Sequence, residues 1–288
     1  MDSAVTIPSS DAMLPDDATT MQPLQPIKLA TGIILDMDGV LWRGDEALPG
    51  MAALFERLYE RKIPFALATN NSMKSPADYV VKLAGFGVTG VEPSHILTSG
   101  VVAVSYLKAN YPPDTLIHVL GGDGLKALIT AAGYPLHFMG EEKASVVVAG
   151  LDTRVTYDKL KRAALQIRAG ATFIGTNDDV TIPTPEGLAP GAGSLLAMLK
   201  AATDREPLLM GKPNPAMFEA ALALLGTPPA RTLMIGDRLD TDIFGAARVG
   251  LRTALVLTGV STRAQAESGA ITPDAIYAGL PELLAAWA

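Results

Sequence analysis

The sequence predicts an α/β protein built around parallel sheet. Short apolar runs rich in β-branched residues alternate with longer segments of helical spacing along most of the 288-residue chain. Several of the apolar runs end abruptly in acidic or amide residues. Alternation of this kind is typical of βαβ units, in which helices cover both faces of the parallel strands.

Composition limits the kinds of protein this chain can be. With 49% hydrophobic and 18% charged residues, it can build two domains with ordinary cores. A net charge of -7 and a pI near 5.0 disfavour extended binding to nucleic acid. The absence of cysteine excludes disulfides, thiolate zinc sites and cysteine nucleophiles. Without a signal peptide pattern or an apolar run of about 18 residues, we expect a soluble, cytoplasmic protein that does not enter a membrane.

The expected elements follow one another in a regular order. Residues 1–26 mix Ser, Thr, Pro and Asp without periodicity and are expected to form a disordered tail. Expected strands are 32–35, 63–68, 96–99, 116–120, 145–149, 171–175, 208–210, 232–236 and 255–257. Expected helices are 51–59, 75–90, 101–110, 125–132, 156–169, 195–202, 215–224, 246–250 and 281–287. The segment 176–194 is polar and rich in proline, and is expected to be a long loop.

The first expected strand ends in two carboxylates. Asp36 and Asp38 follow the apolar run 32–35, and Gly39 then allows the backbone to turn. Two like charges so close together repel each other unless a cation or a proton lies nearby. The pair could therefore hold a cation, although a strand that simply ends in solvent would look the same.

Two further polar segments follow expected strands. Thr69, Asn70 and Asn71 place a hydroxyl and two amides in one turn, which could receive an anion or could serve only as an Asx turn and helix cap. Lys212 follows the run 208–210 and precedes a helix, where it could face a ligand or solvent.

A second acidic strand end appears late in the chain. Asp237 follows the apolar run 232–236, and Asp240 and Asp242 come soon after it. The two acidic strand ends, the Thr-Asn turn and the lysine therefore all fall at the carboxyl ends of expected strands. In an open parallel sheet this is the edge at which ligands bind. Asp240 is the weakest candidate of its cluster and is expected to be a surface acid.

One alternative is dinucleotide binding. Gly122, Gly124 and Ala127 follow an expected strand and open a helix, and Glu141 and Glu142 lie at the spacing of a ribose-binding acid. A lone glycine pattern is weak support, and a tight turn between strand and helix explains it equally well. The three histidines, His95, His118 and His137, are expected to be structural or on the surface.

Taken together, these motifs resemble the haloacid dehalogenase (HAD) superfamily of phosphohydrolases. The chain is similar to subfamily IIA, the group of NagD-like, 4-nitrophenyl-phosphate, phosphoglycolate and pyridoxal-phosphate phosphatases. The resemblance covers about residues 30–260 and rests on four motifs in order, with an insert of the size expected for a cap. Those motifs are Asp36-Met37-Asp38-Gly39-Val40-Leu41, Thr69-Asn70-Asn71, Gly211-Lys212-Pro213, and Gly236-Asp237 with Asp242.

The resemblance implies a fold and a reaction. The fold would be a three-layer, Rossmann-like α/β core, residues 27–74 and 206–288, with an inserted α/β cap of the C2 type, residues 75–205. The reaction would be Mg²⁺-dependent hydrolysis of a small phosphomonoester, such as a sugar phosphate, a nucleoside monophosphate, phosphoglycolate or pyridoxal phosphate, through an aspartyl-phosphate.

The resemblance also implies a role for each candidate residue. Asp36 would be the nucleophile and Asp38 the acid and base, and Lys212 would offset charge on the nucleophile and the transition state. Mg²⁺ would take Asp36, the backbone carbonyl of Asp38, and Asp237, with Asp242 behind them. The phosphoryl oxygens would meet Thr69 and the amides of Asn70 and Asn71.

The cap would set which substrate is accepted. The loop from Asn177 to Gly187 is the expected specificity segment, although Asn177-Asp178-Asp179 departs from the more usual Asn-Pro-Asp of the relatives. A homodimer through the cap is expected by analogy. A phosphotransferase or mutase that uses the same aspartyl-phosphate stays open, as does a non-catalytic regulator that binds a phosphorylated metabolite.

Overall fold

The central element is a six-stranded parallel sheet. A computed structural model describes residues 26–138, 143–184 and 186–288. The expected tail, residues 1–26, therefore lies outside the described residues except for Pro26, which begins helix α1 (Pro26–Leu29). The strand order is β14-β13-β12-β1-β4-β5, and every neighbouring pair is parallel. Their bounds are β1 Gly32–Leu35, β4 Phe65–Thr69, β5 Ile96–Thr98, β12 Thr232–Gly236, β13 Arg252–Val256 and β14 Ala275–Tyr277.

Helices cover both faces of this sheet, because successive side chains of each strand point to opposite sides. Ile33 and Leu35 of β1 belong to one apolar cluster, whereas Ile34 between them belongs to another. The first face is covered by α1, α2 (Met51–Glu60), α3 (Pro76–Gly85) and α11 (Leu280–Trp287). The second face is covered by α4 (Ser99–Asn110), α8 (Pro215–Leu225) and α9 (Phe244–Arg248). The predicted three-layer α/β arrangement is confirmed.

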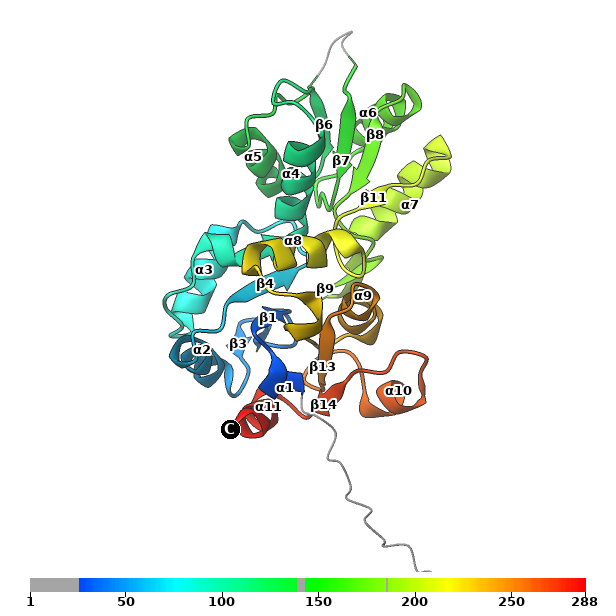
Figure 1. The fold of residues 1–288 in the computed structure, drawn as a ribbon. Coiled ribbons are helices and arrows are strands. Elements are labelled where there is room, and N and C mark those ends of the chain that lie inside the picture. Colours follow the sequence, from blue (N-terminus) through cyan, green and yellow to red (C-terminus); the bar gives the residue numbers. More distant parts are fainter. Residues whose placement is uncertain (1–25, 139–142, 185) are drawn as a thin grey trace, which may run out of the picture.

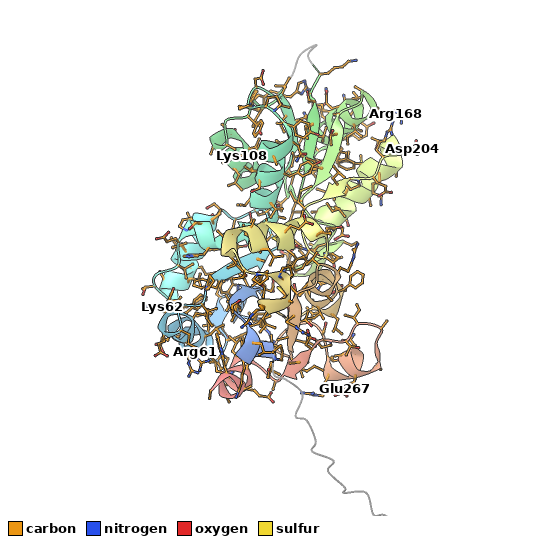
Figure 2. The ribbon with its side chains drawn as sticks, in the orientation of Figure 1. Arg61, Lys62, Lys108, Arg168, Asp204 and Glu267 are labelled. Atoms are coloured by element: carbon orange, nitrogen blue, oxygen red, sulfur yellow. The ribbon has the colours of Figure 1, made fainter. Side chains whose placement is uncertain are left out.

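A second parallel sheet forms the other end of the molecule (Figure 1). It has the order β11-β8-β7-β6, made of β6 Ile117–Leu120, β7 Val146–Ala149, β8 Thr172–Gly175 and β11 Leu208–Leu209. Its apolar faces pack on α4 and α5 (Asp123–Ala131) on one side, and on α6 (Tyr157–Arg168) and α7 (Ala192–Thr203) on the other. Arg168 and Asp204, labelled in Figure 2, lie at the outer edge of this part.

Two strands do not lie in the sheet in which the predicted division into core and cap placed them. β5 was expected in the cap, because the division put residues 75–205 there, but it pairs with β4 of the main sheet. β11 was expected in the core, which the division resumed at residue 206, but it pairs with β8 of the second sheet. A run as short as Leu208–Leu209 carries no signal for the sheet edge that it joins. The rest of the division into core and cap stays a prediction.

The expected loop 176–194 is partly regular structure. It contains an antiparallel hairpin, β9 (Thr181–Thr184) and β10 (Gly187–Pro190), and its last residues already belong to α7. Its prolines concealed the strands, since proline is depleted in sheet interiors but tolerated in an isolated two-stranded edge. A second hairpin, β2 (Trp42–Arg43) with β3 (Glu46–Ala47), was not predicted.

The remaining elements complete the main part of the molecule. A π-helical turn, Leu239–Ile243, precedes α9, and α10 spans Arg263–Ser268. Short 3₁₀ turns occupy Pro93–His95 and Pro229–Arg231. Arg61, labelled in Figure 2, covers Trp287 of α11 with its guanidinium carbon 5.4 Å from the ring centroid. Among the described residues, no helix is both long and apolar enough to cross a membrane.

The glycine pattern that suggested dinucleotide binding has a different explanation in the structure. A Cβ added at Gly124, in the first turn of α5, would lie 2.6 Å from the backbone oxygen of Met73. This glycine therefore lets the helix pack against the segment that follows β4. The acids assigned to the ribose, Glu141 and Glu142, lie outside the described residues. His95 stacks on Phe65 at 4.8 Å and accepts a hydrogen bond from the Glu92 amide, which is a structural role as expected.

Leu35 tests how much the central strand contributes to stability. This side chain is fully buried beside the site, so we expect Leu35→Ala to lower the free energy of unfolding by about 2–5 kcal/mol through lost burial and a cavity. Leu165→Ala is the matched control, because Leu165 on α6 is 55% exposed and should change the stability by about 0.5 kcal/mol or less. Urea unfolding measures both. Equal losses in the two variants would contradict the central placement of β1.

Candidate active site

The candidate residues meet because β12, β1 and β4 are neighbours at the centre of the main sheet. Asp36 directly follows β1, Thr69 is the last residue of β4, and Asp237 directly follows β12. The amide of Asp36 still donates to the backbone oxygen of Ile235 at 2.9 Å, so the parallel ladder fixes the two strand ends side by side. The expectation that the acidic strand ends share one edge of the sheet is confirmed.

Three buried carboxylates form a cluster at this edge. One carboxylate oxygen from each of Asp36, Asp237 and Asp242 lies within 4.8 Å of the others. The three residues are 8%, 2% and 1% exposed. Burial of a carboxylate without a compensating partner is costly, so the cluster requires positive charge.

One cation at the cluster is Lys212. Its Nζ lies 2.5 Å from Oδ1 of Asp36 and 2.7 Å from Oδ1 of Asp242, and it donates to the backbone oxygen of Ala68 at 3.1 Å. Burial acts to lower the pKa of Lys212, but Asp242 and Asp36 together raise it above its ordinary value. The lysine is thus a buried, charged ammonium between two carboxylates.

One ammonium does not balance three carboxylates, and burial together with the excess negative charge raises the pKa values of Asp36 and Asp237. Burial raises the pKa of Asp36 well above its ordinary value, against the opposing effect of Lys212, and Asp242 and Asp237 raise it further. Burial, followed by the charge of Asp242, raises the pKa of Asp237 to about 6. One oxygen of Asp237 accepts from the amide of Val260 at 2.8 Å, and the other has no hydrogen-bond partner among the described residues. That oxygen is available to a cation.

Two glycines allow the carboxylates to come this close to the backbone. A Cβ at Gly259 would lie 1.8 Å from Oδ2 of Asp237. A Cβ at Gly236 would lie 2.3 Å from the Cβ of Asp242. Any larger residue would have to displace one of the clustered side chains.

Asp38 lies at the rim of the cluster and is held by an unpredicted residue. The indole N–H of Trp42 donates to Oδ1 of Asp38 at 2.8 Å, and Trp42 is fully buried. Gly39, at φ 88°, turns the chain between them, and its carbonyl accepts from the hydroxyl of Thr258 at 2.6 Å. Trp42 stands in the same stretch as the acidic motif, but nothing in its spacing indicated a hydrogen bond back to Asp38.

The Thr-Asn turn is closely hydrogen-bonded within itself. The hydroxyl oxygen of Thr69 accepts from the amide of Asn71 at 3.2 Å. Oδ1 of Asn71 accepts from the amide of Met73 at 2.8 Å, which is the predicted Asx turn. The side chain of Asn70 bonds to the backbone of Lys212 instead of pointing freely into the site.

A cavity of about 580 Å³ joins these residues to the loop that precedes the β9–β10 hairpin. Nδ2 of Asn177, the predicted specificity residue, donates to the backbone oxygen of Asn70 at 2.7 Å. All nine predicted site residues line the cavity, together with Arg43, Asp179 and Arg238, which the sequence did not single out. The predicted nine are Asp36, Asp38, Thr69, Asn70, Asn71, Asn177, Lys212, Asp237 and Asp242.

Geometry does not by itself assign a role to each residue. Asp242 was expected behind the metal ligands, and its carboxylate lies in one cluster with Asp36 and Asp237. Asp240, expected on the surface, is exposed and forms a two-point ion pair with Arg238. The individual roles stay predictions.

Comparisons with known proteins agree with this arrangement. A family model described as haloacid dehalogenase-like hydrolase matches residues 33–135, and a second, HAD-hydrolase-like model matches residues 209–283. An acid sugar phosphatase of Staphylococcus epidermidis is 37% identical over 240 residues, covering 83% of this chain and 91% of that protein.

Solved structures of similar proteins have the same fold. The 4-nitrophenylphosphatase of Thermotoga maritima is 36% identical with a TM-score of 0.84, covering 91% of this chain and 99% of its own. NagD of E. coli K-12 is 30% identical with a TM-score of 0.80, covering 88% and 98%.

The raised pKa of Asp237 predicts how stability changes with pH in the metal-free protein. A carboxyl with a folded-state pKa of about 6 favours folding below its ordinary pKa, and this contribution is lost as the pH rises through 6. Asp237→Asn removes the titration, so with EDTA present we expect the variant to gain on the wild type by up to roughly 3 kcal/mol between pH 4 and pH 7.

Urea unfolding at a series of pH values measures this difference. Asp45→Asn is the control, because Asp45 is an exposed acid outside the cluster. A difference between Asp237→Asn and the wild type that stays constant with pH would contradict the assignment of the buried carboxyl.

Proposed function

We propose, on the premise that this chain belongs to subfamily IIA of the haloacid dehalogenase-like hydrolases, that it is a Mg²⁺-dependent phosphatase acting on a small phosphomonoester. The observation that carries the proposal is the buried cluster of Asp36, Asp237 and Asp242 around the ammonium of Lys212. It combines a nucleophile, a cation site and a fixed positive charge at one edge of the sheet.

The residues fit a divalent cation. Three carboxylates and one ammonium leave a formal charge of about two negative units when all are ionised, which one Mg²⁺ would balance. The donors are all oxygens, as Mg²⁺ prefers, and Oδ1 of Asp237 is buried without a partner among the described residues. Asp36, the backbone carbonyl of Asp38, and Asp237 would hold the ion, with Asp242 beside them. When bound, Mg²⁺ supplies charge neutralisation for the phosphoryl group.

The chain's own residues then divide the reaction into two displacements. In the first, a carboxylate oxygen of Asp36 forms a bond to phosphorus while the bond from phosphorus to the leaving oxygen breaks, and Asp38 gives that oxygen a proton. In the second, Asp38 takes a proton from water as the water oxygen attacks phosphorus. The bond to Asp36 breaks, and inorganic phosphate leaves.

Lys212 and the Thr-Asn turn would stabilise the charge that moves during these steps. The ammonium already touches the oxygen of Asp36 and would offset charge spread over the phosphoryl oxygens. Thr69 and the side-chain Nδ2 of Asn71 would meet those oxygens. Trp42 would keep the carboxyl of Asp38 in place through its indole N–H.

The size of the cavity is compatible with a small phosphomonoester. About 580 Å³ must hold the phosphoryl group, the ion and the rest of the substrate. The S. epidermidis relative is named an acid sugar phosphatase, which favours sugar phosphates among the substrate classes open to this chain. Nucleoside monophosphates, phosphoglycolate and pyridoxal phosphate remain candidates, and the proposed homodimer through the cap stays a prediction.

Two other functions would use the same site. A phosphotransferase or mutase would form the same aspartyl-phosphate but would pass the phosphoryl group to an acceptor other than water, so product analysis would find no free phosphate. A regulator would bind the phosphorylated metabolite without turnover. The names of the relatives favour hydrolysis over both. A phosphate-release screen over the four substrate classes tests the proposal.

Asp36→Asn tests the nucleophile. The two side chains have nearly the same shape, so we expect an intact fold but a loss of phosphate release of roughly 10³-fold or more, because the amide cannot attack phosphorus. Release of inorganic phosphate from 4-nitrophenyl phosphate measures the rate, and circular dichroism reports the fold. Asp114→Asn, an exposed acid far along the chain, should behave as the wild type. Activity at the wild-type level in Asp36→Asn would remove the assignment.

Chelation tests the cation. We expect EDTA to abolish phosphate release and added Mg²⁺ to restore it, because the carboxylate cluster loses its balancing charge. Excess Mg²⁺ should also raise the melting temperature of the wild type through binding to the folded state, but not that of Asp237→Asn. If neither EDTA nor Mg²⁺ changes the rate or the melting temperature of the wild type, the proposed role of the metal in the reaction is wrong.

A further inference from the structure

Asn70 joins four segments of the chain that are far apart in sequence. It lies just after β4, between Thr69 and Asn71. Its backbone oxygen accepts two hydrogen bonds, from the hydroxyl of Ser99 at 2.6 Å and from Nδ2 of Asn177 at 2.7 Å. Its side chain contacts Lys212 and Asp179. The residue therefore connects the sheet edge to α4, to the cap loop and to the lysine segment.

The side-chain amide of Asn70 holds the backbone of Lys212 from both sides. Its Oδ1 accepts from the amide of Lys212 at 2.8 Å, and its Nδ2 donates to the carbonyl of the same residue at 2.9 Å. Two hydrogen bonds to one residue fix both the position and the orientation of that backbone. The side chain of Lys212 then reaches Asp36 from this fixed point.

The second proton of the same amide is used on the cap side. Nδ2 of Asn70 also donates to Oδ2 of Asp179 at 3.2 Å. Partial burial raises the pKa of the Asp179 carboxyl above its ordinary value. The amide of Asp179 donates to Oδ1 of Asn177, so the two cap residues form one turn. Both donor positions and the acceptor of the Asn70 side chain are thus occupied within the protein, which leaves none for a phosphoryl oxygen.

Gly211 makes this close approach possible. A Cβ at residue 211 would lie 2.6 Å from Oδ1 of Asn70 and 2.8 Å from the backbone oxygen of Thr176. The lysine segment, the Thr-Asn turn and the residue that follows β8 therefore meet only because position 211 carries no side chain. Packing this tight passes a displacement of one segment on to the others.

We infer that Asn70 is a positioning residue that sets the place of Lys212 and ties it to the cap loop, and that its side chain is not a ligand of the phosphoryl group. The role of Lys212 in turnover rests on the proposed function, whereas its placement by Asn70 does not. The position of the loop of Asn177 and Asp179 and the alignment of the ammonium with Asp36 are then coupled through one residue.

The kinetic test is a double-mutant cycle with Lys212→Ala. We expect Asn70→Ala to lower kcat roughly ten- to hundredfold, with a much smaller change in KM, because a misplaced ammonium no longer stabilises the transition state. In the Lys212→Ala background the same change should cost almost nothing, because its effect passes through the lysine. An equal loss in both backgrounds, a loss confined to KM, or no loss at all would overturn the proposal.

A second measurement does not depend on activity. Amine labelling followed by mass spectrometry reports how accessible each lysine is, and Lys212 is only 3% exposed in the folded protein. Asn70→Ala should raise the labelling rate of Lys212 while leaving that of Lys82 unchanged, since Lys82 lies in α3 with 17% of its side chain exposed. Asp179→Ala should give a smaller rise that disappears in the Asn70→Ala background. An unchanged rate at Lys212, or equal increases at both lysines, would contradict positioning by Asn70.

Two variants serve as controls. Asn110→Ala makes the same substitution at the end of α4, where the amide bonds only to its own helix at the carbonyl of Tyr106, and should match the wild type in both assays. If Asn70→Ala does not fold, Asn70→Asp keeps the volume and the acceptor for the Lys212 amide but loses the donor, and the same outcomes apply. If the wild type releases no phosphate and Asn70→Ala still raises the labelling rate of Lys212, the proposed function is refuted and the positioning role of Asn70 stands.

Discussion

The site depends on an imbalance of charge in a buried place. Three carboxylates, Asp36, Asp237 and Asp242, are clustered with one ammonium, that of Lys212, which contacts Asp36 and Asp242, and all four residues are nearly removed from solvent. A cluster of this kind is stable only if protons or a cation supply the missing positive charge. Under the proposed function, a divalent ion and a phosphoryl group would use the same imbalance together. Stability and function therefore draw on one electrostatic feature.

The parallel sheet is what forces the charges together. β12, β1 and β4 are adjacent, so residues at their carboxyl ends share an edge whatever their distance along the chain. Glycines at 236 and 259 remove the side chains that would otherwise push Asp242 and Asp237 away. The apolar clusters on both faces hold the strands in register, and the cost of burying the acids is offset by the packing around them.

The second sheet contributes more than a cover over the cavity. Its loop reaches the main sheet through Asn177 and Asp179, and both contact Asn70. Asn70 also fixes the backbone of Lys212. A single side-chain amide thus connects Asp179 of this loop with the backbone that carries the ammonium of Lys212.

The sequence alone determined the class of fold, the family and nine of the residues that line the cavity, because buried strands and acidic strand ends leave local signals that need no knowledge of contacts. Tertiary structure decided what those signals cannot encode. The sheet joined by short strands such as β5 and β11 depends on long-range pairing, and the β9–β10 hairpin was concealed by its prolines. Hydrogen-bond partners were equally out of reach: Asn70 looked like an anion ligand from its residue type, yet its amide is saturated by Lys212 and Asp179, residues more than a hundred positions away.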